Sequence, residues 1–106
     1  MFAKVLLIGL VLGAAGNIAS ARTAYSKCLG SWTRSQVRAG AEEAAFQANL
    51  LVACKAEEAA FRAASIATDV AAKIARATAE QNASDEIAYI RENAVETFKA
   101  ALPEPQ

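Results

Sequence analysis

The chain has 106 residues, with 11 basic side chains, 11 acidic side chains and no histidine. This balance gives no electrostatic reason to expect binding to nucleic acid or to an anionic membrane surface. The lack of histidine removes the usual general base and the commonest metal ligand. Hydrophobic residues make up 55% of the chain, but many are alanines, which favour helix and bury little surface each. We therefore expect a small helical protein with a thin core.

The first 21 residues have the three-part pattern of a cleavable secretory signal. Residues 1–4 form a short positive head, and residues 5–15 form an apolar run. Residues 16–21 form a tail of small residues ending in Ala19, Ser20 and Ala21. Small side chains at the first and third of these positions suit signal peptidase, so we expect cleavage before Arg22.

A retained membrane anchor is the alternative interpretation of this segment. A spanning helix needs about 20 apolar residues, and the run is interrupted earlier, at Gly16 and Asn17. No second apolar stretch follows, so we expect no stable membrane span after cleavage. The signal predicts export to the periplasm or the extracellular space. It leaves one helical domain over residues 22–102 and a flexible tail over residues 103–106.

The exported part is predicted to begin with a helix over residues 23–38, with Thr23 as its N-cap. Tyr25, Leu29 and Trp32, together with Cys28, recur at the spacing of one helix face. This position makes Trp32 a core residue rather than a ligand-stacking group. Gly40 is expected to end the segment.

A long alanine-rich helix is predicted next, over residues 41–81, because this stretch contains neither glycine nor proline. A break at Ser65–Asp69 is left open, since Ser, Thr and Asp compete with the helical backbone. Residues 82–84 are predicted to form a turn, which would expose a glycosylation sequon at Asn82.

The last predicted helix carries an apolar stripe and stops at Pro103. The stripe consists of Ile87, Ile90, Ala94 and Phe98. No segment alternates apolar and polar residues as a half-buried strand does. The fold class is therefore all-α: a small helical hairpin or three-helix domain with one long central helix, stapled by one disulfide.

The sequence AEEAAF occurs twice, at residues 41–46 and 56–61. The acidic pairs could suggest a cation site, but adjacent helical residues diverge by about 100° and do not converge on one ion. A duplicated packing unit is preferred, with Phe46 and Phe61 as anchors and the glutamates on a solvated face. Chance repetition in an alanine- and glutamate-rich chain stays open.

Cys28 and Cys54 are the only cysteines, and an even count in an exported chain usually forms a disulfide. If the helices fold back at Gly40, the two residues lie about 18 Å and about 21 Å from the bend, nearly level. Free thiols or a bond between two chains are the alternatives. A redox pair would favour Cys-x-x-Cys spacing, and two cysteines without histidine make a poor zinc site.

The same reasoning folds the last helix back at Ala83, which brings Phe98 near Thr68. In this arrangement Ile66, Val70 and Ile74 are only half covered. We expect this surface to contact a second copy of the chain or another helical protein.

No catalytic motif or phosphate-binding loop occurs, so we expect no enzymatic activity, cofactor or metal. A small exported interaction or structural module is the first functional hypothesis. A holdase-like envelope chaperone is the alternative, by analogy of fold alone. The third hypothesis is a protein that binds at the surface of a lipid membrane. It is disfavoured because the polar faces of such helices are richer in Lys and Arg than those of this chain.

Overall fold

The computed structural model describes residues 17–103, which form four α-helices and no strand. The helices are α2 (Ile18–Arg38), α3 (Glu43–Leu50), α4 (Lys55–Ala71) and α5 (Arg76–Ala101). The predicted all-α class is therefore confirmed. The head and apolar run of the predicted signal lie outside the described residues, as do residues 104–106 of the predicted tail.

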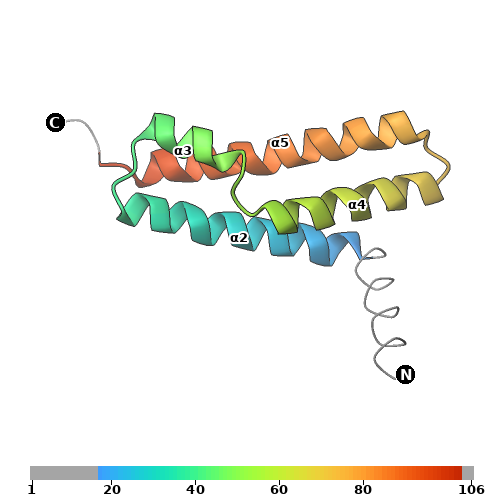
Figure 1. Cartoon of the computed structure of the whole chain (residues 1–106), viewed down its shortest axis with the longest axis horizontal. Helices are drawn as coiled ribbons and strands as arrows, with labels where there is room; N and C mark the ends of the chain where they lie inside the picture. The colour runs from blue at the N-terminus through green and yellow to red at the C-terminus, as the bar shows by residue number, and fades with distance from the viewer. Residues whose placement is uncertain (1–16, 104–106) are drawn as a thin grey trace, which may run out of the picture.

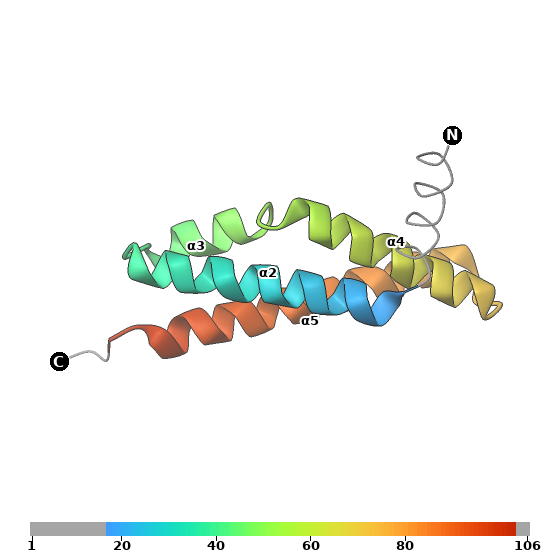
Figure 2. The ribbon, with the colours of Figure 1, turned by 90° about the horizontal axis from the view of Figure 1, so that it is seen from below.

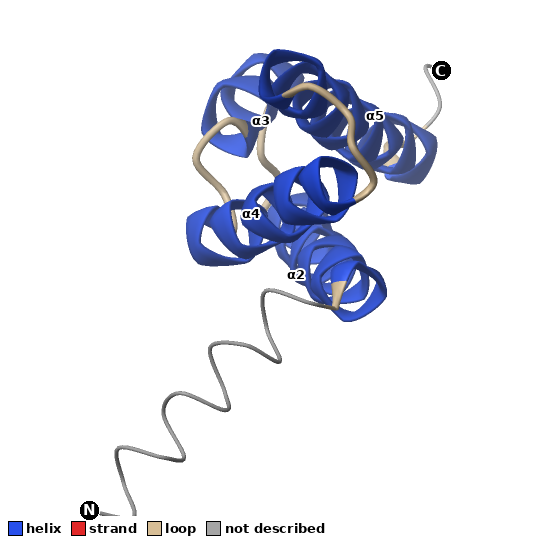
Figure 3. Cartoon of the chain, turned by 90° about the vertical axis from the view of Figure 1, so that its right-hand side faces the viewer, coloured by secondary structure: helices blue, strands red, loops and turns tan. Residues whose placement is uncertain are grey.

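The helices form an up-down-up bundle in which α3 and α4 share the middle position. Helices α2 and α5 run in the same direction, and α3 followed by α4 runs back between the ends of the bundle (Figures 1 and 2). Helix α4 packs on both α2 and α5, whereas α3 packs mainly on α5. Figure 3 shows the bundle from one end, with α3 and α5 at the top and α4 and α2 below them.

The predicted uninterrupted helix over residues 41–81 is wrong, because the chain leaves the helix twice. Residues 51–54 form a turn between α3 and α4, and residues 72–75 connect α4 to α5. Each connection contains a non-glycine residue with positive φ: Cys54 at 57° and Lys73 at 71°. This conformation costs an L-residue about 1–2 kcal/mol, so local propensity alone does not predict it.

The break that the sequence left open at Ser65–Asp69 does not occur, because α4 continues through these residues. The Thr68 hydroxyl donates a hydrogen bond to the backbone carbonyl of Ala64, at 2.8 Å, so the polar side chain has a partner inside the helix.

The last helix begins at Arg76, so the predicted turn at residues 82–84 is wrong. Asn82 lies within α5 and donates a hydrogen bond to Asp69, at 3.1 Å, while Ala83 is fully buried. Because the connection lies about ten residues earlier than predicted, the pairing of α5 also shifts. Phe98 packs on Phe46 rather than near Thr68.

The first helix begins at Ile18, and its N-cap is Asn17 rather than the predicted Thr23. The Asn17 side chain accepts a hydrogen bond from the backbone N–H of Ser20, at 3.0 Å. This cap lies upstream of the predicted cleavage position, so α2 contains an extra turn at its start.

Aromatic side chains from three helices form the centre of the core at one end of the bundle. Phe46 stacks on Trp32 from α2, with ring centroids 4.9 Å apart, and on Phe98 from α5, at 4.1 Å. The predicted stripe on α5 is buried, as are both phenylalanines of the repeat. The packing interpretation of the two phenylalanines is confirmed.

The predicted disulfide between Cys28 and Cys54 is present, with the two Cα atoms 6.0 Å apart. It joins the middle of α2 to Cys54, the N-cap residue of α4. The hairpin turn at Gly40, where φ is 74°, also matches the prediction.

Two glycines of the first hairpin should respond in opposite directions to alanine. At Gly30 a Cβ would meet nothing closer than an Arg34 nitrogen at 3.6 Å, so Gly30→Ala should stabilise the protein by about 0.5–1 kcal/mol. Gly40→Ala should destabilise it by about 1 kcal/mol or more, because φ there is +74°. Urea denaturation measures both. Equal shifts of the same sign would contradict the two conformations.

Candidate functional site

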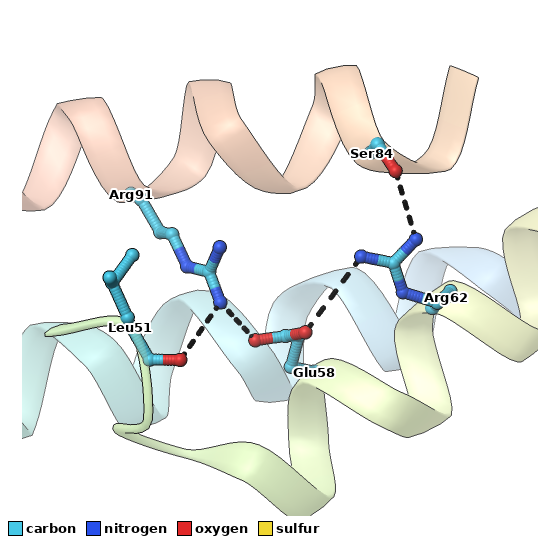
Figure 4. A network of polar contacts seen from close by, with 5 residues as sticks. All are labelled: Leu51, Glu58, Arg62, Ser84 and Arg91. Atoms are coloured by element: carbon cyan, nitrogen blue, oxygen red, sulfur yellow. Dashed lines mark hydrogen bonds and ion pairs between the residues drawn. The ribbon is translucent and has the colours of Figure 1, made fainter. Parts of the chain in front are cut away.

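A polar network crosses the middle of the bundle and joins three segments of the chain (Figure 4). Glu58 on α4 accepts a hydrogen bond from Arg91 on α5. Arg91 also donates to the backbone carbonyl of Leu51, at 3.2 Å. Arg62 lies 3.9 Å from the other Glu58 oxygen and donates to the Ser84 hydroxyl, at 3.0 Å. The network thus connects the α3–α4 turn to α4 and to α5.

The network corrects the prediction of a solvated face for one of the repeat glutamates, Glu58, while Glu42 is exposed as predicted. The Glu58 side chain is only 17% exposed, and that of Arg91 only 23%. Glu58 and Arg62 have the i, i+4 spacing of a surface pair within one helix, and this spacing gives no indication of Arg91. Arg91 directly follows Ile90 of the buried stripe. This position indicates that the Arg91 side chain lies at the edge of the core, but it does not indicate that Glu58 is its partner.

Tyr25 lies beside this network and is fully buried. Its hydroxyl oxygen has no hydrogen-bond partner within residues 17–103. Burial raises the pKa of Tyr25 above 10.0, and the charge of Arg91 opposes this shift in part. The phenol is therefore neutral at physiological pH, and the glutamate beside it is paired with guanidinium groups. This chemistry suits holding helices together better than transferring protons.

The raised pKa of Tyr25 predicts a loss of stability at alkaline pH. In the folded state the Tyr25 hydroxyl keeps its proton to a higher pH than in the unfolded state. The contribution of Tyr25 to the free energy of unfolding is therefore complete below pH 10.0 and is lost as the pH rises beyond it. Tyr25→Phe should reduce the drop in urea midpoint between about pH 8 and about pH 11. Tyr89→Phe is the control, since Tyr89 is 65% exposed. Equal effects of the two variants would contradict the assignment.

Removing the Glu58 carboxylate should destabilise the bundle by about 1–3 kcal/mol, because Arg91 would then keep a half-buried charge without its anionic partner. Glu58→Gln preserves the shape of the side chain, and the exposed Glu92→Gln is the matched control. The control should change stability by less than about 0.5 kcal/mol. Similar urea midpoints for both variants would show that the network contributes nothing.

The disulfide has a carboxylate nearby, which raises the question of a metal site. The ligand atoms of Cys28, Cys54 and Glu57 all lie within 4.8 Å of one another. The two sulfurs are bonded to each other, however, and a disulfide offers no thiolate to a metal. In this form the group acts as a staple.

The predicted partner surface lies on α4 and on the connection that follows it. Val70 is 41% exposed, and Ile66 and Ile74 are partly buried. None of the three joins the buried core. Ile66 and Val70 share a face of α4 at i, i+4 spacing, whereas Ile74 lies outside the helix.

The residues predicted to flank the cleavage site all lie inside α2. Ala19 is exposed, while Ala21 is partly buried against the core. Arg22 lies over the ring of Phe61, at 5.3 Å from its centroid, and 3.9 Å from a Glu86 oxygen.

A groove of about 470 Å³ runs between α3 and α5, and we name it the α3–α5 groove. Its lining consists of Gln47, Leu50, Leu51, Ala88, Arg91, Glu92, Val95, Glu96 and Lys99. Leu51 is 59% exposed, and Val52 beside it is 57% exposed. The sequence did not predict this groove, because Leu51 and Val52 were expected inside one continuous helix over residues 41–81.

The polar network, the disulfide and the α3–α5 groove are the features from which a function can be inferred. Within residues 17–103, no helix has both the length and the apolar character needed to cross a membrane. The longest helix, α5, has 26 residues but confines its buried side chains to one stripe. No protein-family model, curated protein or solved structure matches this chain.

Proposed function

We propose that this chain is a small exported protein without enzymatic activity, and that its helical domain binds a helix of another protein in the α3–α5 groove. The three-part pattern of the N-terminal residues supports export. The disulfide adds support, because such bonds persist in the periplasm and outside the cell and are rare in a reducing cytosol.

The observation that carries the binding proposal is the exposed side chain of Leu51 in the lining of the groove, next to Val52 in the same turn. Large aliphatic side chains are usually buried, yet each of these is more than half exposed. The turn that presents them is held on one side by the Arg91 hydrogen bond to the Leu51 carbonyl and on the other by the disulfide at Cys54. A preorganised apolar pair loses little conformational freedom on binding, which favours affinity.

The shape and charge of the groove favour an amphipathic helix with basic residues along one edge. A groove between two helices accepts the apolar face of a third. On its α5 side, Glu92 and Glu96 are exposed and make no ion pair with any residue in the range 17–103. Their charges complement Lys or Arg on the partner, which would raise the association rate and select the orientation.

Site-specific photocrosslinking tests the proposal in the full-length protein expressed in its native envelope. A photoreactive amino acid at Leu51 should give one dominant crosslinked protein. The same probe at Ala77, which is exposed on α5, should give none. The attached segment, identified by mass spectrometry, should have an apolar helical stripe with a basic edge. Glu92→Lys/Glu96→Lys should reduce the product about tenfold.

Two results would contradict the binding proposal. The first is a yield at Leu51 no higher than at Ala77. The second is a crosslink to a second copy of this chain, which would instead support self-association.

A holdase-like chaperone is the second candidate, and exposed apolar residues outside the groove favour it. Tyr89 on α5 is 65% exposed, and Val70 on α4 is 41% exposed. A holdase would crosslink at Leu51 and at Val70 to many unrelated unfolded proteins. Its binding of a hydrophobic dye would also rise on mild heating or acidification.

A further inference from the structure

A small crevice lies between α2 and α5, which run side by side in the bundle (Figure 2). Its volume is about 170 Å³, and we name it the α2–α5 crevice. Leu29, Ile90 and Ala94 line it, and each of these side chains is at most 8% exposed. The crevice shares no lining residue with the α3–α5 groove, so the two are separate features of the surface.

The hydroxyl of Thr33 is buried in the lining of the crevice and lacks an internal partner. Thr33 is 1% exposed, and its Oγ1 atom has no hydrogen-bond partner within residues 17–103. Other helical hydroxyls donate to a backbone carbonyl one turn earlier, as Ser35 does to Trp32, at 2.7 Å. Thr68 does the same to Ala64. A buried hydroxyl without a partner destabilises a protein, so a partner from outside the chain is expected here.

Gly30 leaves space in the same crevice. It lies inside α2, where glycine is less favourable than alanine because it loses more backbone entropy on folding. The packing of the bundle does not require the missing side chain. A Cβ at this position would meet nothing closer than an Arg34 nitrogen, at 3.6 Å. The glycine therefore contributes room in the crevice rather than a close contact between helices.

We propose that the α2–α5 crevice binds a small neutral molecule that has a compact apolar body and a hydroxyl or amide group. None of the described residues that line the crevice is charged, so an ionic ligand would lose hydration without gaining an ion pair. A cavity of about 150 Å³ holds a molecule the size of benzene, which sets the size of the apolar body. The Thr33 hydroxyl can donate and accept a hydrogen bond. Exposed polar side chains flank it at Ser26, Asn93 and Thr97.

Titration of the full-length chain with three probes, followed by the amide chemical shifts in NMR spectra, tests the proposal. Benzyl alcohol has the proposed chemistry, toluene lacks the hydroxyl, and benzoate adds a negative charge. Benzyl alcohol should shift the amides around Gly30 and Ala94, with a Kd of about 1 mM or lower. Toluene should bind about three- to tenfold more weakly, which is the contribution of one hydrogen bond. Benzoate should not bind.

Thr33→Val distinguishes a ligand-binding hydroxyl from a structural one. Because valine keeps the shape and removes an unpartnered hydroxyl, the variant should not lower the urea midpoint. It should bind benzyl alcohol about three- to tenfold more weakly and should no longer prefer it to toluene. Thr23→Val, at an exposed position of the same helix, is the control and should bind benzyl alcohol as the wild type does. Gly30→Leu should fill the crevice and abolish binding while the circular dichroism signal of the helices is retained.

Two results would overturn the proposal. The first is the absence of shifts at the crevice amides with benzyl alcohol at concentrations up to about 10 mM. The second is unchanged binding of benzyl alcohol by Thr33→Val, whatever the stability of that variant. Neither result bears on the partner helix proposed for the α3–α5 groove, because the two features share no residue.

Discussion

Replacing Phe46 by alanine should lower the free energy of unfolding by about 3–5 kcal/mol. Phe46 is fully buried and stacks between Trp32 and Phe98, with ring centroids 4.9 Å and 4.1 Å away. Its removal would leave a cavity where α2, α3 and α5 meet. In an alanine-rich chain few large side chains can move in to fill it. Urea denaturation monitored by circular dichroism measures the loss.

A double-mutant cycle with Phe98→Ala separates the aromatic stack from general core packing. The coupling between the two rings should be about 0.5–1.5 kcal/mol beyond their separate effects. Phe61→Ala is a suitable comparison, because Phe61 is equally buried but its ring lies 6.4 Å from its aromatic neighbour, Tyr25. A loss below about 1 kcal/mol for Phe46→Ala would mean that the stack is not central to the fold.

Removing the disulfide should destabilise the protein by about 3–4 kcal/mol, which is a large share of the net stability of a small domain. The bond joins residues 26 positions apart, and its loss frees the intervening hairpin in the unfolded chain. Cys28→Ala/Cys54→Ala, compared with wild type by urea denaturation, measures the effect.

The backbone at position 54 supplies the control for this experiment. Cys54 has a φ of 57°, a conformation that glycine adopts more easily than alanine. Cys28→Ala/Cys54→Gly should therefore recover about 1 kcal/mol relative to the double alanine variant. If the two double variants are equally stable, the turn must relax to another conformation once the bond is gone.

The disulfide experiment also bears on the proposed binding function. The bonded Cys54 ends the turn that carries Leu51 and Val52, so its release should loosen the exposed pair. We expect the photocrosslinking yield at Leu51 to fall in the double alanine variant even under conditions where the domain remains folded.

Local patterns in the sequence were sufficient to predict the fold class, the buried stripe of α5 and the disulfide. The stripe from Ile87 to Phe98 follows from helical periodicity, which depends only on residues three or four positions apart. The pairing of Cys28 with Cys54 was predicted from the even number of cysteines, the expected export and a turn at Gly40, and the bond is present. Each of these inferences needs little knowledge of how distant segments pack.

Tertiary structure alone decided where the middle helix breaks, and with it the register of α5. Cys54 and Lys73 adopt positive φ although neither is glycine. Cys54 is held there by the disulfide to α2, and at Lys73 the N–H of Ile74 donates to the Asp69 carbonyl, at 3.0 Å, which closes the end of α4. The turn before α4 contains Leu51, which lines the α3–α5 groove, and the connection at residues 72–75 places α5 so that Arg91 meets Glu58. These partners are 33 residues apart, and their meeting depends on where the chain turns, which helix propensity does not encode.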